Sequence, residues 1–408
     1  MNKVVIIGGG AAGLMAALTA AKSGANVTVY EHNKSVGKKI LASGNGRCNI
    51  INTTAFVSDY FGQNPNFVAH ALKIMPFSTF EKFALSIGLI LNAKDDGRCY
   101  PLSDEAKSVV LAFNEALKQA NITIKNEHNV TKITKVNNTF VIEVDENREH
   151  FDKVLIATGS EAAPQLGATA DGYAFAEGFG HTIEPTYPSL VQLHIDSNIH
   201  QKIAGVKTVA EVTLYLNGKP EDKVLGDTLF TRYGISGLSI LDLSQKASLA
   251  LLEYQHVAVG INLLPHLSRQ ALANQLEKLF TAIPQHSLHN ALNGIISTKM
   301  VELLLASAKI DPNKQASSLN TKEIKKLAHQ LQDWRFEIID THGFKHAEVS
   351  GGGISTAEIN DKTMESKLVD GLYFAGEVLD IVGKRGGYNF NFAWASGMIA
   401  GQQLAKVQ

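Results

Sequence analysis

Three glycines close to the N-terminus form the clearest chemical pattern in this chain. Gly8, Gly10 and Gly13 follow the apolar run 4–7, and Glu31 ends a second apolar run. The first glycine permits a tight turn, the second lets the backbone approach a pyrophosphate, and the third lets a helix pack close to a sheet. The pattern therefore predicts a site for a ligand that carries a pyrophosphate.

The residues after these glycines are expected to form a helix from Ala11 to about Ser23, with Ala12 in its first turn. The free N–H groups and the positive dipole end of this helix would face the phosphates. Glu31 can accept hydrogen bonds from both hydroxyls of an adenosine ribose, whereas its charge would repel a 2′-phosphate. The site is therefore expected to take FAD or NAD rather than NADP.

A second glycine-rich region near the C-terminus favours FAD over NAD. The buried-type strand 371–375 leads into Gly376 and Glu377, and residues 386–389 (Gly-Gly-Tyr-Asn) precede a helix predicted from about Phe392 to Lys406. A reduced flavin carries negative charge near its N1 atom, so a helix N-terminus behind two glycines suits it. Glu377 could hold the ribityl hydroxyls. An NAD site needs neither feature.

Composition narrows the possible classes of protein. The chain has 408 residues, of which 45% are hydrophobic, and its formal net charge of -1 gives no basic footprint for a nucleic-acid partner. The glycine triplet interrupts the N-terminal apolar run that would otherwise suggest a signal peptide or a membrane span. We therefore expect a soluble, cytoplasmic protein with neither a nucleic acid nor a membrane as partner.

Cysteines and histidines give no sign of a metal site. Cys48 and Cys99 lack the spacing of a zinc site or a disulfide framework. Cys48 lies in a glycine-rich loop and could be a redox-active thiol, but a small packed residue is the favoured interpretation. His181, His194 and His342 have no sequence partner at catalytic or metal-binding spacing, so no metal is expected.

The order of predicted elements indicates a discontinuous α/β fold. Helical spacing covers 67–88 and 103–120, and strands follow it up to the buried-type run 154–157. The middle of the chain is rich in strands, with Asn217-Gly218 as a hairpin turn, and 264–331 is almost entirely helical. We predict a Rossmann-like FAD-binding domain at 1–188 and 345–408, a β-rich substrate-side domain at 189–262 and 332–344, and a helical insert at 263–331.

Several longer motifs resemble those of one protein family. They are residues 37–49 (Gly-Lys-Lys-Ile-Leu-Ala-Ser-Gly-Asn-Gly-Arg-Cys-Asn), 97–101, 157–159, 172–173, 234–237, 363–367, 371–380 and 386–389. In these motifs the chain resembles the BaiN-like, aminoacetone-oxidase-like family of bacterial flavoproteins, within the two-dinucleotide-binding group. The resemblance implies an FAD-dependent oxidoreductase for a small substrate, such as an amine or an activated C=C bond, with NAD(P)H or oxygen as its partner.

The glycine patterns and the resemblance together define an expected FAD site. Arg47 also suits phosphate oxygens, because a guanidinium pairs with them. By the resemblance, backbone at Val130 should meet the adenine and loop 39–49 should lie along the cofactor. The predicted cofactor-binding residues are Gly8, Gly10, Ala11, Ala12, Gly13, Glu31, His32, Lys39, Ser43, Gly44, Arg47, Asn49, Val130, Thr158, Gly159, Gly376, Glu377, Gly387, Tyr388, Asn389 and Phe390.

The catalytic residues are not fixed by the sequence, and Arg232 and Tyr388 are the candidates. Members of the family usually have Thr-His before the Gly-Ile-Ser-Gly turn and Pro after it, whereas this chain has Thr231-Arg232 and Leu238, which leaves the substrate class open. A second nucleotide-binding pattern is missing, so NAD(P)H would dock only transiently. The alternatives are a flavin-binding module with a sensing or partner-binding role and, less favoured, an NAD-dependent dehydrogenase. The sequence does not indicate the oligomeric state.

Overall fold

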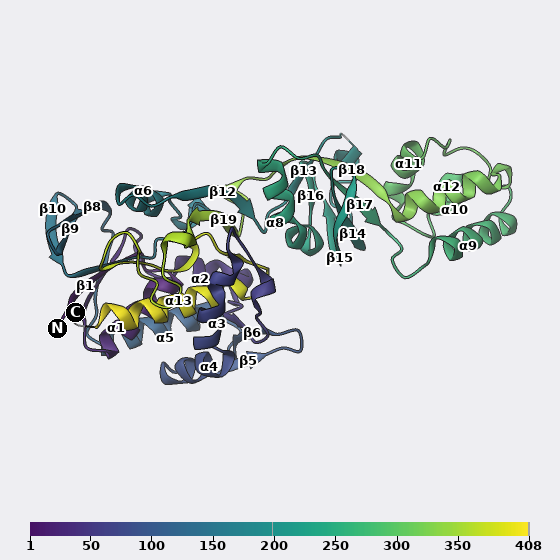
Figure 1. The fold of residues 1–408 in the computed structure, drawn as a ribbon. Helices are drawn as coiled ribbons and strands as arrows, with labels where there is room; N and C mark the ends of the chain where they lie inside the picture. Colours follow the sequence, from purple (N-terminus) through teal and green to yellow (C-terminus); the bar gives the residue numbers. More distant parts are fainter. Residues whose placement is uncertain (198, 407–408) are drawn as a thin grey trace. The chain divides into compact units, whose positions relative to one another are not determined.

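The computed structural model describes residues 1–197 and 199–406, and the chain divides into two compact units. The first unit consists of residues 1–187 together with 348–408, and the second consists of residues 188–347. The first unit is therefore discontinuous in sequence. Figure 1 labels the helices and strands of both units.

The centre of the first unit is a five-stranded parallel sheet in the order β20-β11-β1-β2-β7. The first three strands in this order are β20, β11 and β1, and nearly all of their side chains are buried. Such burial is expected for a parallel sheet that is covered on both faces. This confirms the predicted α/β class. The bounds are β1 Lys3–Ile7, β2 Asn26–Glu31, β7 Thr123–Asn126, β11 Lys153–Ile156 and β20 Leu372–Phe374.

Two helices from opposite ends of the chain pack against each other beside this sheet. Helix α1 (Ala11–Lys22) and helix α13 (Tyr388–Leu404) lie side by side in Figure 1. A Cβ atom on Gly397 or Gly401 of α13 would lie only 2.3 or 2.5 Å from a backbone oxygen of α1. The two helices can approach this closely because these positions lack a side chain.

The chain ends are also fastened to each other. The Asn2 side-chain amide donates to the backbone oxygen of Lys406 at 2.7 Å, and the Lys153 ammonium donates to the same oxygen at 2.8 Å. The Lys153 ammonium also donates to the backbone oxygen of Gln403 at 2.8 Å. The N-terminal strand, the middle of the sheet and the last helix are thus joined at one place.

Four further sheets and several helices complete the first unit. A three-stranded antiparallel sheet (β10-β9-β8) and three smaller sheets (β3-β6-β5, β21-β4 and β12-β19) surround the parallel sheet. The strands are β3 Ile51–Asn52, β4 Tyr60–Phe61, β5 Leu91–Ala93, β6 Arg98–Pro101, β8 Val130–Val136, β9 Thr139–Val144, β10 Asn147–Phe151, β12 Ile183–Ser189, β19 Val349–Ile354 and β21 Val382–Gly383. The helices are α2 Lys38–Ala42, α3 Val68–Ile74, α4 Phe77–Ser86, α5 Ala106–Gln119 and α6 Asp171–Gly178.

The second unit is a closed barrel with a group of helices, α9 to α12, inserted between its strands β17 and β18. The barrel order is β13-β16-β15-β14-β17-β18, and the turn at Asn217-Gly218 joins β14 to β15 as predicted. The barrel and the helices share one hydrophobic core. The strands are β13 Leu193–Ile195, β14 Lys207–Leu216, β15 Lys219–Phe230, β16 Gly234–Ser236, β17 Val257–Asn262 and β18 Trp334–Thr341. The helices are α7 Ile199–Lys202, α8 Leu238–Leu252, α9 Arg269–Ala282, α10 Leu288–Leu292, α11 Thr298–Ser307 and α12 Thr321–Gln332.

Three predicted element bounds were wrong, each for a local reason. The predicted helix 67–88 is interrupted, because Pro76 lies between α3 and α4 and the residue before a proline avoids helical geometry. Helix α5 begins at Ala106 rather than Ser103, with Asp104 in a left-handed conformation ahead of it. Helix α13 begins at Tyr388, one turn earlier than predicted, since Gly387 already forms its N-cap.

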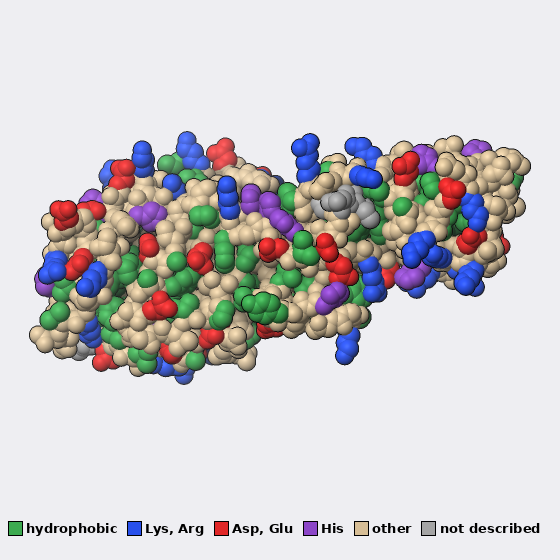
Figure 2. Space-filling model, turned by 90° about the horizontal axis from the view of Figure 1, so that it is seen from above, with side chains coloured by type: hydrophobic (Ala, Val, Ile, Leu, Met, Phe, Trp, Pro, Cys, Tyr) green, Lys and Arg blue, Asp and Glu red, His purple; other side chains and the backbone are tan. Residues whose placement is uncertain are grey.

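Acidic and basic side chains are intermingled on the face shown in Figure 2, and neither sign gathers into a broad patch there. Within the part of the chain that the structure describes, every helix is too short or too polar to cross a membrane.

Candidate functional site

The N-terminal glycines occupy three distinct environments after β1. Gly8 has a φ of +106°, and a Cβ atom there would lie 2.4 Å from the oxygen of Ala157. A Cβ atom on Gly13 would lie 2.0 Å from the oxygen of Gly8. At Gly10, in contrast, a Cβ atom would meet no heavy atom of the described residues within 4 Å. The first and third glycines are thus required by the fold, whereas the second faces open space.

Helix α1 presents its N-terminus at this open space. Its first intrahelical hydrogen bond runs from Leu14 N to Gly10 O at 2.9 Å. The N–H groups of Ala11, Ala12 and Gly13 precede that bond, so helix geometry leaves them without an intrahelical acceptor. A helix end of this kind, with an uncrowded glycine as its cap, suits an anion such as a phosphate.

Glu31, at the end of β2, lies beside the glycine loop. Its carboxylate accepts from Gly9 N at 2.8 Å, and its other oxygen accepts from Asn33 N at 2.8 Å and from the Asn33 side-chain amide at 2.7 Å. The residue is 7% exposed, so these bonds compensate for much of the desolvation of its charge. The carboxylate is fixed in orientation, with lone pairs left for further donors.

The neighbours of Glu31 include two other predicted residues. His32 is about one-third exposed and its Nδ1 lies 3.9 Å from the Glu31 carboxylate. The backbone oxygen of Glu31 accepts from His128 N at 3.2 Å, which brings the segment leading to Val130 close to the end of β2. Val130 itself is buried at the start of β8.

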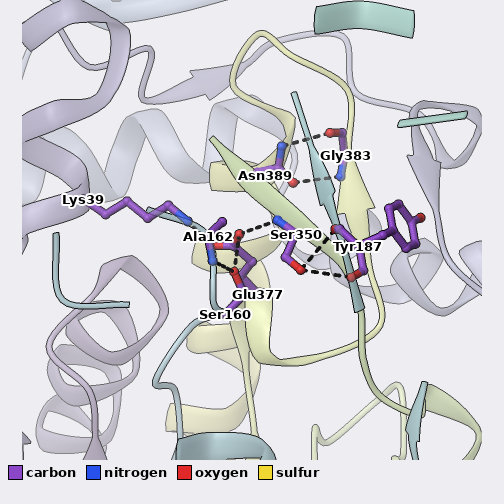
Figure 3. A network of polar contacts seen from close by, with 9 residues as sticks. Lys39, Ser160, Ala162, Tyr187, Ser350, Glu377, Gly383 and Asn389 are labelled. Atoms are coloured by element: carbon purple, nitrogen blue, oxygen red, sulfur yellow. Dashed lines mark hydrogen bonds and ion pairs between the residues drawn. The ribbon is translucent and has the colours of Figure 1, made fainter. Parts of the chain in front are cut away.

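Glu377 is the centre of a polar network that joins distant parts of the chain (Figure 3). One carboxylate oxygen pairs with the Lys39 ammonium at 2.6 Å, and the other accepts from the Ser160 hydroxyl at 2.8 Å and from Ser350 N at 3.0 Å. A Cβ atom on the preceding Gly376 would lie 2.8 Å from the Cβ of Ala12. The network therefore lies directly beside the N-terminus of α1.

The end of β11 adds a buried hydroxyl and another open glycine. Thr158 Oγ1 is buried and has no hydrogen-bond partner among the described residues, and a Cβ atom on Gly172 would lie 2.1 Å from it. Gly159 has a φ of +78°, and a Cβ atom there would meet no described heavy atom within 4 Å. Such a buried, unpaired hydroxyl at the carboxyl end of a parallel strand is suited to a bound polar ligand.

The loop before α13 is held by its own polar side chains. The Asn389 side chain accepts from Gly383 N at 2.7 Å and donates to Gly383 O at 2.9 Å (Figure 3). Gly387 has a φ of +99° and approaches the backbone of Ile51. Tyr388 and Phe390 are half-buried, and burial raises the pKa of the Tyr388 hydroxyl. The first intrahelical hydrogen bond of α13 runs from Asn391 N to Gly387 O at 3.0 Å, so helix geometry leaves the three preceding N–H groups without an intrahelical acceptor.

The segment expected as a loop at 39–49 begins inside helix α2, and its non-helical part, 43–49, has an unusual backbone. Gly44, Asn45 and Gly46 all have positive φ, and so does Cys48. The Ser43 hydroxyl donates to Ile40 O at 2.7 Å. The Asn49 side chain accepts from Cys99 N at 3.1 Å and so joins the loop to β6.

Arg47 has an environment that the sequence did not reveal, whereas the burial of Cys48 agrees with its interpretation as a small packed residue. The Arg47 side chain is half exposed, with its guanidinium 5.3 Å from the Tyr100 ring centre and one nitrogen 3.9 Å from an Asp104 oxygen. Cys48 and Cys99 are both fully buried. Burial raises the pKa of the Cys48 thiol to about 12 and that of Cys99 to about 11, so both stay protonated and unreactive at neutral pH.

The two catalytic candidates belong to different units. Tyr388 begins α13 in the first unit, and Arg232 is an exposed residue just before β16 in the second. Among the described residues, no three His, Cys, Asp or Glu side chains gather as metal ligands.

Several residues of this region were not found from the sequence. Asn391 on α13 accepts from Asn52 N at 2.7 Å and donates to Asn52 O at 3.0 Å, and the Trp394 indole donates to Ile50 O at 2.7 Å. Ser160 and Ser350 were missed as well. Their partners are distant in sequence, so residue type and spacing carry no signal for them.

Comparison with known proteins gives the family. The family model described as the HI0933-like protein Rossmann domain matches residues 2–403. The chain belongs to the HI0933-like family. The resemblance to BaiN-like proteins is thereby confirmed, since a 3-dehydro-bile acid delta(4,6)-reductase from Clostridium scindens is 36% identical over the full length of both chains.

Other members of the HI0933-like family have a different name. Ribosomal RNA dihydrouridine synthases from Escherichia coli and Haemophilus influenzae are 33% and 34% identical, over 98% and 96% of this chain and 97% and 96% of theirs. A solved 3-ketosteroid delta1-dehydrogenase from Sterolibacterium denitrificans shares the fold, with a TM-score of 0.53 at 12% identity and 99% of both chains covered. The family and the Rossmann-type fold are thus established.

Proposed function

We propose that this protein is an FAD-dependent reductase of carbon–carbon double bonds that are conjugated to a carbonyl group. The observation that supports FAD as the cofactor is the close approach of Gly376 to Ala12, by which Glu377 lies beside the N-terminus of α1. Glu31, the open Gly10 and Glu377 then belong to one continuous region of the first unit. A long dinucleotide needs such a row of polar groups, whereas a small metabolite does not.

The residues present suit FAD in type and placement. The fixed Glu31 carboxylate is suited to ribose hydroxyls, and the N–H groups at the start of α1 are suited to the pyrophosphate. The unpaired Thr158 hydroxyl and the open Gly159 offer further contact. We infer that Glu377 and the N-terminus of α13 hold the ribityl and ring parts.

FAD supplies hydride transfer when it is bound, and the protein has to bind, orient and tune it. The Lys39 ammonium and the Glu377 carboxylate form an ion pair, which fixes both side chains and supplies a donor and an acceptor for polar groups of the cofactor without a net charge. Asn389 fixes the loop before α13 through both of its hydrogen bonds to Gly383. These residues therefore position the cofactor rather than react with substrate.

The reaction class follows from what the named relatives have in common. A bile-acid delta(4,6)-reductase and a dihydrouridine synthase both saturate a ring C=C bond, and in a 3-oxo-4,6-diene and in uracil that bond is conjugated to a carbonyl. The reduction adds a hydride to the carbon distant from the carbonyl and a proton to the adjacent carbon. The electron donor is inferred to be NAD(P)H, docked transiently.

The substrate itself is a further part of this proposal. From the sequence we expected no nucleic-acid partner. Two of the named relatives, however, act on ribosomal RNA, and this argues against that expectation. That exclusion rested on the net charge of -1, and charge reports contacts to phosphates rather than to bases. We therefore include a pyrimidine base in RNA beside a small cyclic enone as a candidate substrate. A cytoplasmic location stays a prediction.

An anaerobic titration tests the proposal. The purified protein is loaded with FAD, reduced chemically, and mixed with a cyclic enone, with uridine-containing RNA, or with an alkene that lacks a carbonyl. We expect the yellow colour to return with at least one conjugated substrate and not with the isolated alkene, with one saturated product formed per flavin. NADH and NADPH are tested separately as reductants.

Two results would contradict the proposal. One is a protein that binds no FAD after reconstitution. The other is reduced flavin that reoxidises only with oxygen and with none of the conjugated compounds.

A further inference from the structure

Three rings of the second unit form a stack, which we call the ring ladder: Tyr233, His342 and His346. The ring centres of Tyr233 and His342 are 3.9 Å apart at an interplanar angle of 12°, and those of His342 and His346 are 4.0 Å apart at 28°. Two nearly parallel rings can both lie about 4 Å from one imidazole only if they lie on its opposite faces. His342 is therefore the central ring of the ladder.

The barrel register fixes the ladder in place. Strand β13 pairs with both β16 and β18, so His194 on β13 lies next to Gly234 on one side and next to Asp340 on the other. Tyr233 immediately precedes Gly234, and His342 immediately follows β18. His194 Nε2 and His342 Nδ1 share a hydrogen bond of 2.8 Å.

One end of the ladder is open to solvent. Tyr233 and His342 are half-buried, whereas His346, in the short turn Phe344–His346 after β18, is exposed. Burial and the neighbouring imidazoles lower the pKa of His342, so its ring stays neutral at physiological pH. A neutral His342 ring adds no charge to the centre of the stack, and the exposed imidazole of His346 ends the stack on the solvent side.

We propose that the ring ladder binds a planar nucleobase, stacked on the exposed ring of His346. The ladder has apolar ring faces and polar edges, since Tyr233 carries a hydroxyl and each imidazole carries two nitrogens. A nucleobase has the same distribution, whereas a hydrocarbon ring would leave the polar edges without partners. Aromatic and histidine side chains hold unpaired bases in this way.

Charge near the ladder agrees with a nucleotide. Arg232 and Lys345 are exposed and adjoin Tyr233 and His346 in the sequence, so the short segments that carry these two rings also carry cationic residues. A uracil-type base is favoured because the proposed function includes pyrimidine reduction. Only this choice of base rests on the proposed function. The base can come from an RNA strand or from a free nucleotide.

Binding by the full-length protein tests the ladder. Fluorescence anisotropy is measured with labelled single-stranded oligouridylate and with an abasic strand of the same length, and unlabelled uridine monophosphate serves as competitor. The variants are His346→Ala, His346→Phe and, as a matched control, His286→Ala at an exposed histidine in the helical part of the same unit. Thermal unfolding of each variant confirms that it is folded.

Loss of one stacked base weakens binding by roughly tenfold. We expect this loss in His346→Ala, wild-type binding in His286→Ala, and recovery in His346→Phe, which keeps a ring face without the imidazole nitrogens. The abasic strand should bind weakly to every variant. Competition by uridine monophosphate identifies a free nucleotide as occupant, and competition by RNA strands alone identifies RNA.

Three results would overturn the ladder proposal: no binding of oligouridylate, equal binding of the abasic strand, or unchanged binding by His346→Ala. Failure of the proposed function would give a different result. In that case the protein would bind no flavin, or its reduced flavin would not be reoxidised, while it still bound the base through His346.

Discussion

Adding a single methyl group at Gly10 or at Gly13 should separate cofactor binding from folding. The two glycines belong to one loop and one helix turn, yet their surroundings are opposite. A Cβ atom at Gly13 would lie 2.0 Å from Gly8 O, while one at Gly10 would meet nothing within 4 Å among the described residues. Gly10→Ala should therefore impair FAD binding alone, and Gly13→Ala should impair the fold.

The expected magnitudes follow from these distances. Real Cβ atoms stay at least 3.0 Å from such neighbours, so α1 would have to move by about 1 Å to accept Gly13→Ala. Overpacking of this kind costs about 1–3 kcal/mol, and the better helix propensity of alanine offsets up to about 1 kcal/mol. A net loss of about 2 kcal/mol corresponds to a fall in Tm of roughly 4–8 °C.

Gly10→Ala should leave the stability nearly unchanged. The backbone at Gly10 has φ -81° and ψ -171°, which alanine adopts without strain. Alanine is a poorer N-cap by about 1 kcal/mol, but it also restricts the unfolded chain by about 0.4–1 kcal/mol. The added methyl group would displace a phosphate from the N–H groups of α1, and loss of one charge-assisted hydrogen bond weakens FAD binding by about tenfold or more.

The assay combines FAD titration by flavin fluorescence with thermal unfolding of the apoprotein. Gly294→Ala is the control, because it adds a methyl group in open space within the second unit. The reasoning is refuted if Gly10→Ala binds FAD as the wild type does, or if Gly13→Ala keeps the wild-type Tm.

Three further perturbations concern the network, α13 and a buried histidine. Glu377→Ala should lower the free energy of unfolding by about 2 kcal/mol in urea denaturation, because it leaves the Ser350 N–H without its acceptor. Trp394→Phe should cost about 1–2 kcal/mol by the same measurement, since the oxygen of Ile50 loses its indole donor. Stability should also fall as the pH decreases below about 6.5, because burial lowers the pKa of His181 and the unfolded chain then binds the proton first. The His181 contribution is complete above that pH and is lost progressively towards its lower folded pKa.

For each of these three predictions, the stability of a variant can be compared with a stated expectation, and the outcome could contradict the prediction. Glu377→Gln keeps the shape and should lose less stability than Glu377→Ala, so equal losses would argue against the acceptor role. A Trp394→Phe variant with wild-type stability would show that the indole hydrogen bond contributes nothing. His181→Asn should flatten the dependence of unfolding free energy on pH, and an unchanged slope would assign that slope to other groups.

Local patterns in the sequence predicted those features that depend on local geometry. The tight turn at Gly8, the close packing at Gly13 and the hairpin at Asn217-Gly218 each follow from a backbone that few residue types can adopt. The burial of Cys48 was also anticipated, since a small apolar residue in a turn is usually packed.

The polar networks could not be predicted in the same way. His181 bonds to Glu358 and to Ser366, 177 and 185 residues away, and His194 bonds to His342 after 148 residues. The spacing of residues in the sequence therefore indicated no partner for these histidines, whereas the folded chain gives each one a hydrogen-bond partner. Such pairs depend on strand register across the sheet or barrel, which is a property of the whole chain.

Residues 364–367 (Met-Glu-Ser-Lys) form a distinctive motif that has a structural role. The Ser366 hydroxyl lies 2.8 Å from His181 Nε2 and accepts from the N–H groups of Leu368 and Val369 at 3.0 and 2.9 Å. Its proton is therefore directed to the imidazole, and the residue is only 6% exposed. The arrangement looks like part of a hydrolytic triad, but a buried hydroxyl that is fully hydrogen-bonded fixes the loop rather than attacking a substrate.

The seam between α1 and α13 has a consequence for biosynthesis. In chain order the glycine loop and α1 come before the inserted unit, and α13 comes after it. A nascent chain therefore carries the apolar face of α1 uncovered until α13 has been synthesised, and the seam closes only then. A disruption of α13 would act at the same seam, far from the glycine loop in the gene but next to it in the folded molecule.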